Sequence, residues 1–124
     1  MASRTILIVD DNPGNRSVFS RALLQYGYRV LEAENGAEAI RLASEHLPDL
    51  ILMDLEMPVM NGWDAAELLK RDPRTRDIRI IAISVHDVFE HEAVHFASFL
   101  SKPISPSLLL AEVQRLVPDE TSSS

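Results

Sequence analysis

Five side chains with acid, hydroxyl or ammonium groups stand at the ends of short apolar segments in this sequence. They are Asp10, Asp11, Asp54, Ser84 and Lys102. If folding brings the three carboxylates together, they repel one another and need a counter-charge. A hard divalent cation such as Mg²⁺, which prefers oxygen ligands, supplies one, and the lysine ammonium supplies another. A carboxylate beside such charges is suited to phosphoryl transfer, because positioning and charge stabilisation carry most of that catalysis and an aspartate can be the covalent acceptor.

The elements that must position these groups are alternating strands and helices. Short aliphatic segments cover residues 6–9, 28–33, 50–53, 78–84 and 99–101. The stretches between them show helical spacing of apolar residues, and cap-forming residues such as Asn35 and Ser105 stand where helices should begin. This alternation predicts an α/β fold, a doubly wound sheet of five parallel strands with five helices on its two faces. Since the carboxyl ends of parallel strands lie at one edge of a sheet, the reactive side chains should meet there.

Composition and net charge indicate which class of protein the sequence encodes. The chain has 124 residues, of which 46% are hydrophobic and 25% are charged, values typical of one globular domain. We expect this domain to cover residues 1–117, and residues 118–124 to be a disordered tail or the start of a linker. The net charge of −7 disfavours direct binding to nucleic acid. No apolar segment is long enough to cross a membrane and no signal peptide is recognised, so we expect a soluble, cytoplasmic protein.

Three separated segments carry a resemblance to a known family. Residues 8–12 read IVDDN, residues 53–62 read MDLEMPVMNG and residues 100–104 read LSKPI. In this order they resemble the response-regulator receiver domains of two-component signalling, and the resemblance covers roughly residues 4–117. It implies a flavodoxin-like fold and a signalling switch, rather than an enzyme that acts on other molecules. The expected partner is a histidine kinase or a histidine phosphotransfer protein, which would phosphorylate the switch in the presence of Mg²⁺.

The resemblance gives each residue of the predicted site a role. Asp54 would be the phospho-acceptor, and Lys102 would contact an oxygen of the phosphoryl group. Asp11, Asp54 and the backbone carbonyl of Glu56 would bind Mg²⁺ directly, and Asp10 would assist through a water molecule. A cis peptide bond is expected between Lys102 and the proline that follows it.

By the same resemblance, further residues would transmit the phosphorylated state or control how long the phosphoryl group persists. The Ser84 hydroxyl would bind the phosphoryl group, and the aromatic ring of Phe99 would then rotate inward. The face made by the fourth helix, the fifth strand and the fifth helix would present this change to an output protein, and a homodimer through that face is left open. Glu56 and His86 would flank the path of attacking water and so tune autodephosphorylation, with the sign of the Glu56 effect left open.

Two departures from the family pattern concern the segment after Ser84. The next residue is Val85, where a small residue is usual, and its bulk should narrow access to Asp54. Lys102 stands 18 residues after Ser84, which is roughly four fewer than the family pattern requires, or about one helical turn. This loss should shorten the fourth helix, so we expect an unusual partner interface or a mobile segment over about residues 85–96.

Three alternatives can be weighed against the signalling switch. His91-Glu92-x-x-His95 matches the zinc-peptidase pattern, but it lies in the shortest and most polar predicted helix, not in the long buried helix that such a site needs. An aspartate-nucleophile phosphatase should carry a second Asp two residues after Asp10, and Asn12 stands there instead. A phosphorylation-independent interaction module on the same fold would not need the intact acidic residues and lysine. We therefore expect the signalling switch.

Overall fold

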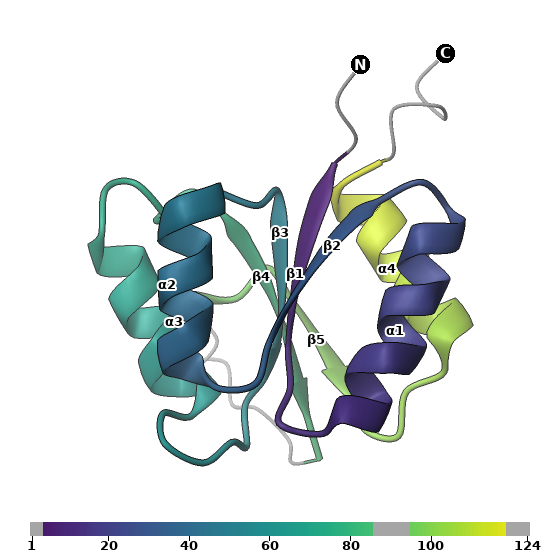
Figure 1. Cartoon of the computed structure of the whole chain (residues 1–124), viewed down its shortest axis with the longest axis horizontal. Helices are drawn as coiled ribbons and strands as arrows, with labels where there is room; N and C mark the ends of the chain where they lie inside the picture. The colour runs from purple at the N-terminus through teal and green to yellow at the C-terminus, as the bar shows by residue number, and fades with distance from the viewer. Residues whose placement is uncertain (1–3, 86–94, 119–124) are drawn as a thin grey trace.

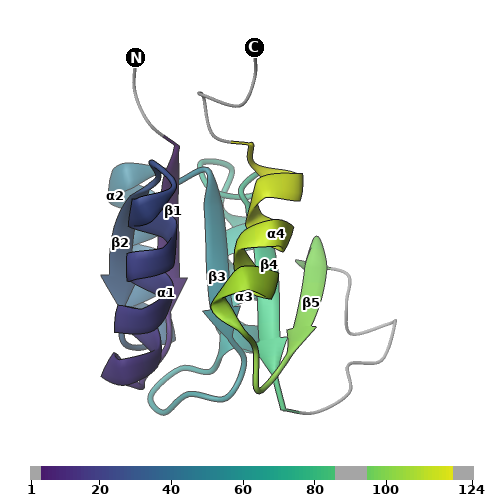
Figure 2. The same cartoon turned by 90° about the vertical axis from the view of Figure 1, so that its right-hand side faces the viewer.

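The chain forms a five-stranded parallel sheet between two layers of helices (Figure 1, Figure 2). The computed structural model describes residues 4–85 and 95–118. The strands are β1 (Thr5–Val9), β2 (Arg29–Ala33), β3 (Leu50–Asp54), β4 (Arg79–Ser84) and β5 (Ser98–Ser101). The helices of the described residues are α1 (Pro13–Gln25), α2 (Gly36–His46), α3 (Gly62–Arg71) and α4 (Pro106–Leu116). In the strand order β2-β1-β3-β4-β5, β1 lies next to β3, so the ends of these two strands are neighbours.

Helices α2 and α3 cover one face of the sheet, and α1 and α4 cover the other (Figure 1). This arrangement confirms the predicted doubly wound α/β fold with five parallel strands. The described residues contain four α-helices, whereas the sequence predicts five for the whole chain. The predicted fourth helix would fall between β4 and β5, where residues 86–94 lie outside the described residues, and the predicted fifth helix is α4. The shortening of the fourth helix therefore stays a prediction.

Each described helix begins at a side chain that accepts a hydrogen bond from the backbone N–H three residues later. These N-cap residues are Asn12, Asn35, Asn61 and Ser105. Such a cap satisfies one of the N–H groups that the first helical turn leaves unpaired. Because the cap of α1 follows Asp10 and Asp11 directly, the helix starts immediately behind these two carboxylates.

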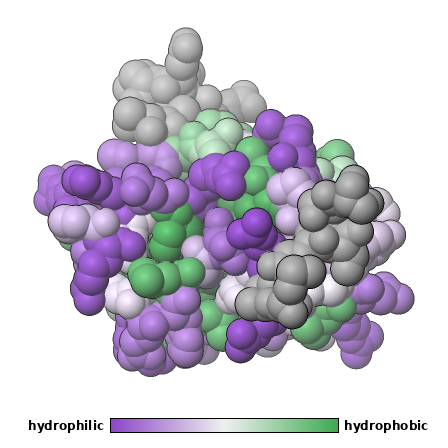
Figure 3. Space-filling view, turned by 90° about the horizontal axis from the view of Figure 1, so that it is seen from above, coloured by the Kyte–Doolittle hydropathy of each residue, from purple (hydrophilic) through white to green (hydrophobic). Residues whose placement is uncertain are grey.

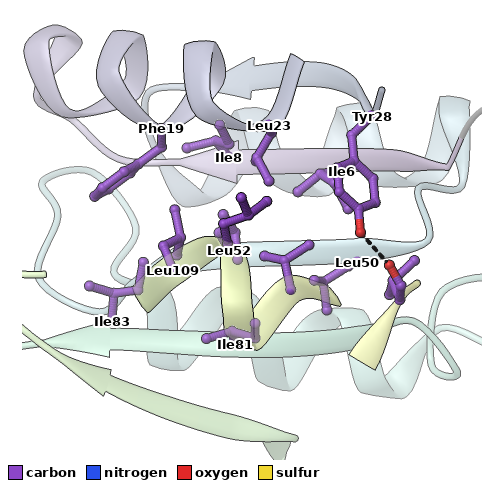
Figure 4. Packing of buried hydrophobic residues seen from close by; sticks show 13 residues of the cluster. Ile6, Ile8, Phe19, Leu23, Tyr28, Leu50, Leu52, Ile81, Ile83 and Leu109 are labelled. Carbon is purple, nitrogen blue, oxygen red and sulfur yellow. Dashed lines mark hydrogen bonds between the residues drawn. The ribbon is translucent and has the colours of Figure 1, made fainter. Parts of the chain in front are cut away.

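Apolar side chains on both faces of the central strands form the core. Neighbouring residues of β1 join two different clusters, since side chains alternate along a strand: Ile8 packs towards α1 and α4, and Leu7 packs towards α2 and α3. Figure 4 shows the first cluster, in which Phe19 and Leu23 of α1 and Leu109 of α4 meet the sheet. Because β1 and β3 are buried on both faces, the residues at their ends extend directly from the packed core.

A buried hydroxyl ties the end of the described chain to this core. Tyr28, just before β2, is 2% exposed, and its hydroxyl donates to the backbone carbonyl of Val117 at 2.7 Å (Figure 4). This bond lies at the amino ends of the strands, opposite the edge that carries the predicted site. Figure 3 looks onto that end of the molecule, where hydrophilic and hydrophobic residues are interspersed. Among the residues that the structure describes, no helix is long and apolar enough to span a bilayer.

Leu52→Ala should lower the free energy of unfolding by roughly 2–5 kcal/mol, because the fully buried side chain of Leu52 leaves a cavity in β3. Urea denaturation followed by circular dichroism measures this change. Leu108→Ala is the matched control, since Leu108 of α4 is 56% exposed, and it should change stability by less than about 0.5 kcal/mol. Equal losses in the two variants would contradict this assignment of the core.

Candidate functional site

Three carboxylates meet at the carboxyl ends of β1 and β3, at the lower edge of the sheet in Figure 1. Asp10 and Asp11 follow β1 directly, and Asp54 is the last residue of β3, which pairs with β1. One oxygen atom from each of the three side chains lies within 4.8 Å of the other two. Asp10 and Asp54 are only 3% and 1% exposed, whereas Asp11 is open to solvent. The cluster therefore consists of two buried acids and one accessible acid.

Both carboxylate oxygens of Asp54 accept hydrogen bonds from the protein. The Lys102 ammonium donates to Oδ2 at 2.9 Å, and the backbone N–H of Glu56 donates to Oδ1 at 3.1 Å. Burial raises the pKa of Asp54 from 3.8 to about 6, because removal from water penalises the charged form, and the charge of Asp10 adds to the rise. The two hydrogen bonds oppose this shift in the pKa. Asp54 is thus ionised near neutral pH, although burial destabilises its ionised form.

Lys102 reaches the cluster from the loop after β5 and provides its fixed positive charge. Burial alone would lower the pKa of Lys102, but the hydrogen bond to Asp54 and the attraction of the surrounding carboxylates outweigh it and raise the pKa. The backbone N–H of Lys102 donates to the carbonyl of Ser84 at 2.9 Å, which continues the pairing of β4 with β5. The peptide bond between Lys102 and Pro103 is cis. The ammonium is therefore positioned by the end of the sheet.

Asp10 shapes the turn from β1 into α1 as well as contributing to the cluster. Its Oδ1 accepts a hydrogen bond from the backbone N–H of Asn12 at 2.9 Å, and its Oδ2 accepts one from the side-chain amide of Asn15 at 3.3 Å. The backbone carbonyl of Asp10 accepts a further bond from Arg16 at 2.6 Å. Because Asn12 is the N-cap of α1, neither Asp10 nor Asp11 is the helix cap.

The loop after β3 lies tightly against the site. A Cβ atom added at Gly62, the first residue of α3, would stand 2.5 Å from the backbone oxygen of Asp54, so only glycine fits there. Within the loop, the N–H of Met60 donates to the carbonyl of Pro58 at 2.8 Å, and Val59 between them has a φ of 68°. This conformation is rare for a β-branched residue. The turn returns the chain over the strand end that carries the Asp54 carboxylate.

Glu56 and Ser84, for which the sequence predicts separate roles, contact each other. The Ser84 hydroxyl donates to Oε1 of Glu56 at 2.7 Å, and the backbone N–H of Val85 donates to the same oxygen at 3.3 Å. In the sheet, Asp54 at the end of β3 pairs with Ile83, so the residues that follow Asp54 lie beside Ser84, the last residue of β4. Sequence reasoning missed this contact, because it depends on the register of β3 against β4, for which the sequence carries no direct signal.

Phe99, predicted to be an aromatic switch, packs on another ring at the surface. It is 37% exposed on β5, and its ring meets Phe96 edge-to-face with centroids 5.5 Å apart. Phe96 in turn meets Trp63 of α3, with centroids 5.4 Å apart. Sequence reasoning assigned no role to Trp63. The row of three rings connects β5 with the start of α3.

The remaining predicted residues fall in residues 86–94, outside the described part of the chain. They are His86, expected to tune dephosphorylation, and His91 and Glu92 of the zinc-peptidase pattern. The tuning role of His86 therefore stays a prediction, and so do the properties predicted for about residues 85–96.

A cavity of about 330 Å³ opens beside Lys102. Its lining comes from α1, the end of β4 and the loop after β5, and consists of Asn15, Val18, Phe19, Ile83, Val85, Lys102, Pro103 and Ile104. Val85, predicted to narrow access to Asp54, is 59% exposed and forms part of this wall. A mainly apolar hollow thus adjoins the charged cluster.

The cluster has the chemistry of a site for a hard divalent cation. Its donors are all oxygen atoms, and their mutual spacing of up to 4.8 Å suits an ion such as Mg²⁺, whose ligands lie at about 2.1 Å. The buried carboxylate of Asp54, facing a fixed ammonium, is suited to reactions in which negative charge develops on a transferred group. The combination fits phosphoryl transfer better than hydrolysis by a bound zinc ion.

Comparison of the sequence with known families and proteins gives a consistent match. The sequence pattern that defines the response regulator receiver domain matches residues 6–114. The polar-differentiation response regulator DivK of Brucella anthropi is 32% identical over 120 residues, which cover 94% of this chain and 98% of DivK. Protein PilH of Pseudomonas aeruginosa is 34% identical over 117 residues, which cover 90% of this chain and 96% of PilH.

Solved structures of similar fold agree with these matches. The chemotaxis protein CheY4 of Vibrio cholerae superposes with a TM-score of 0.87 at 30% identity, covering 94% of this chain and all of that one. The receiver domain of a sensor histidine kinase from Pseudomonas aeruginosa superposes with a TM-score of 0.83 at 31% identity, covering 93% of this chain and 98% of that one. That receiver domain has a magnesium ion coordinated in its active-site cleft.

Lys102→Met should raise the pKa of Asp54 above its value of about 6 in the metal-free protein, because the hydrogen bond and charge that lower it are lost. When the pKa of an acid is higher in the folded state than in the unfolded state, its ionised form destabilises the fold. This loss of stability is complete above the folded-state pKa and disappears as the pH falls to the unfolded-state pKa. The variant should therefore lose most stability, relative to wild type, above pH 6 and least near pH 4. Carboxyl ¹³C NMR and urea denaturation measure the two effects.

Lys70→Met is the matched control for the titration of Asp54. Lys70, the other of the two lysines of the chain, donates to the backbone carbonyls of Arg76 and Ile78, away from the cluster. Its replacement should leave the pKa of Asp54 unchanged. An Asp54 pKa that falls in Lys102→Met, or rises equally in both variants, would contradict the pairing of Asp54 with Lys102.

Proposed function

The chain belongs to the response regulator receiver domain family, and we propose that it is a phosphorylation-dependent signalling switch whose phospho-acceptor is Asp54. Receiver domains work with histidine kinases and output partners in two-component signalling. The observation that supports the proposal most strongly is the contact between Asp54 and Lys102 inside the carboxylate cluster. The proposed phosphoryl donor is a histidine kinase or histidine phosphotransfer protein, which the chain would meet in the cytoplasm.

The acidic cluster is the site proposed for Mg²⁺. Asp11, Asp54 and the backbone carbonyl of Glu56 would hold the ion, and Asp10 would bind it through a water molecule. The all-oxygen donor set supports this choice, and so does the magnesium ion in the similar receiver domain from Pseudomonas aeruginosa. The bound ion supplies positive charge that reduces the repulsion between the carboxylates and an incoming phosphoryl group.

Asp54 is the nucleophile of the proposed transfer. One of its carboxylate oxygens forms a bond to phosphorus while the bond from phosphorus to the donor's imidazole nitrogen breaks, and that nitrogen keeps the electron pair. Lys102, whose ammonium lies 2.9 Å from the carboxylate, can contact an oxygen of the transferred group as charge moves onto Asp54. The mainly apolar hollow, whose lining includes Lys102, is the proposed binding place of the donor's imidazole ring.

Ser84 and Phe99 carry the phosphorylated state to the surface. Ser84 ends β4 next to the cluster, and its hydroxyl donates to an oxygen of the phosphoryl group. Phe99 on the adjacent strand β5 then turns inward and leaves its contact with Phe96. The changed face, formed by the predicted fourth helix together with β5 and α4, meets an output protein or a second copy of this chain.

Incubation with acetyl phosphate and Mg²⁺ should add the mass of one phosphoryl group to the wild-type protein, and Asp54→Asn should abolish the addition. Removal of Mg²⁺ with EDTA should suppress the adduct too, since the unscreened carboxylates repel an anionic donor. Intact-mass spectrometry measures all three samples. Asp77→Asn, an exposed acid near Lys70, is the control and should be phosphorylated like wild type. A full adduct on Asp54→Asn would overturn the assignment.

Glu56 and His86 are proposed to set the lifetime of the phosphoryl group, since both would flank the path of water to Asp54. Replacement of both residues by alanine should change the half-life of the phosphorylated protein several-fold, because the attacking water loses the side chains that orient or repel it. Phosphate release after removal of the donor measures this half-life. The phosphorylated double variant and the phosphorylated wild type should lose the phosphoryl group at different rates. Equal rates would mean that neither side chain acts on the attacking water.

A further inference from the structure

One carboxylate oxygen of Glu56 holds two consecutive residues at the end of β4. It accepts the Ser84 hydroxyl at 2.7 Å and the backbone N–H of Val85 at 3.3 Å. A hydrogen bond to an ionised acceptor is roughly twice as strong as one between neutral groups. Both the side chain proposed to sense the phosphoryl group and the first residue of the following segment are therefore restrained by the same acid.

Glu56 also touches the proposed phospho-acceptor directly. Its backbone N–H donates to Oδ1 of Asp54 at 3.1 Å, while its side chain extends to Ser84. The carbonyl of Ser84 is fixed by the N–H of Lys102 at 2.9 Å, so the end of β4 stays anchored to β5. The Ser84 hydroxyl can consequently change its acceptor by turning its side chain, whereas the N–H of Val85 leaves Glu56 only if the backbone of Val85 shifts.

We propose that the Glu56 side chain is a latch that stabilises the unphosphorylated conformation, and that Ser84 must exchange Glu56 for the phosphoryl group when the switch is turned on. The inference rests on the proposed role of Ser84 and adds a positioning residue to it. It assigns a direction to Glu56: its carboxylate opposes the phosphorylated conformation.

Electrostatics makes the two states of Ser84 mutually exclusive. A phosphoryl group on a side chain carries a charge of about −1.5 to −2 and three strong acceptor oxygens. On Asp54 it competes for the Ser84 hydroxyl and repels the carboxylate of Glu56. Because coupling between two interactions is reciprocal, the factor by which the latch weakens the affinity for a phosphoryl group equals the factor by which that group weakens the latch.

Titration with beryllofluoride, a phosphoryl mimic that binds aspartate carboxylates, at saturating Mg²⁺ tests the latch. Amide NMR signals give the half-saturating concentration for the wild type, Glu56→Ala, Ser84→Ala and the double variant. Glu56→Ala should lower this concentration by roughly ten- to hundredfold, the equivalent of one charge-assisted hydrogen bond. In the Ser84→Ala background the same change should have less than about a threefold effect, because a double-mutant cycle isolates the contact between the two residues.

Glu67→Ala is the control for a general loss of negative charge. Glu67 lies on α3 and pairs with Arg71, so its replacement should shift the half-saturating concentration by less than about twofold. Equal gains from Glu56→Ala with and without the Ser84 hydroxyl would mean simple charge repulsion and would overturn the latch. A wild-type protein that binds no beryllofluoride would instead overturn the proposed function, and the latch with it.

The Val85 amide gives a readout that needs no ligand. In the free protein, Glu56→Ala should move the amide proton signal of Val85 to lower frequency, because its hydrogen bond is lost, and Glu67→Ala should not. A Val85 signal that is the same in the wild type and in Glu56→Ala would also overturn the proposal.

Discussion

Burial of the Asp54 carboxylate beside two other acids is the constraint on which the rest of the structure depends. A charge removed from water is costly unless it is paired and hydrogen-bonded. The protein pairs it with Lys102 and with a backbone N–H of its own loop. In the strand order, β4 separates β3 from β5, so the lysine side chain has to pass the end of β4 to reach Asp54. The long, flexible stem of a lysine suits that reach.

The same arrangement links the Asp54 carboxylate to residues nearer the surface of the protein. Glu56 contacts Asp54 through its backbone and Ser84 through its side chain, and the next strand carries Phe99. Ser84 pairs with Ser101 on β5, two residues beyond Phe99, so the contacts of Asp54 extend to the strand that carries the exposed ring. We propose that a charge added to the cluster shifts this region towards a second arrangement, as a local electrostatic event does in a two-state protein.

The fold and the members of the acidic cluster could be predicted from the sequence because they follow from simple rules. Continuous apolar segments mark doubly covered parallel strands, and the ends of such strands share an edge, so the acids after β1 and β3 had to meet. The contact of Glu56 with Ser84 could not be predicted, because it depends on the register of β3 against β4 and on the path of a loop. The row of rings from Phe99 to Trp63 depends in the same way on packing between distant segments.

Chemical trapping in the unaltered protein tests which residue, if any, accepts the phosphoryl group. Borohydride reduces an aspartyl phosphate to homoserine, and trypsin places Asp10 and Asp11 in the peptide that ends at Arg16 and Asp54 in the one that ends at Lys70. After treatment with acetyl phosphate and Mg²⁺, fragmentation of these peptides should find the reduced residue at Asp54 alone. Reduction at Asp10 or Asp11, with Asp54 intact, would contradict the account of the site.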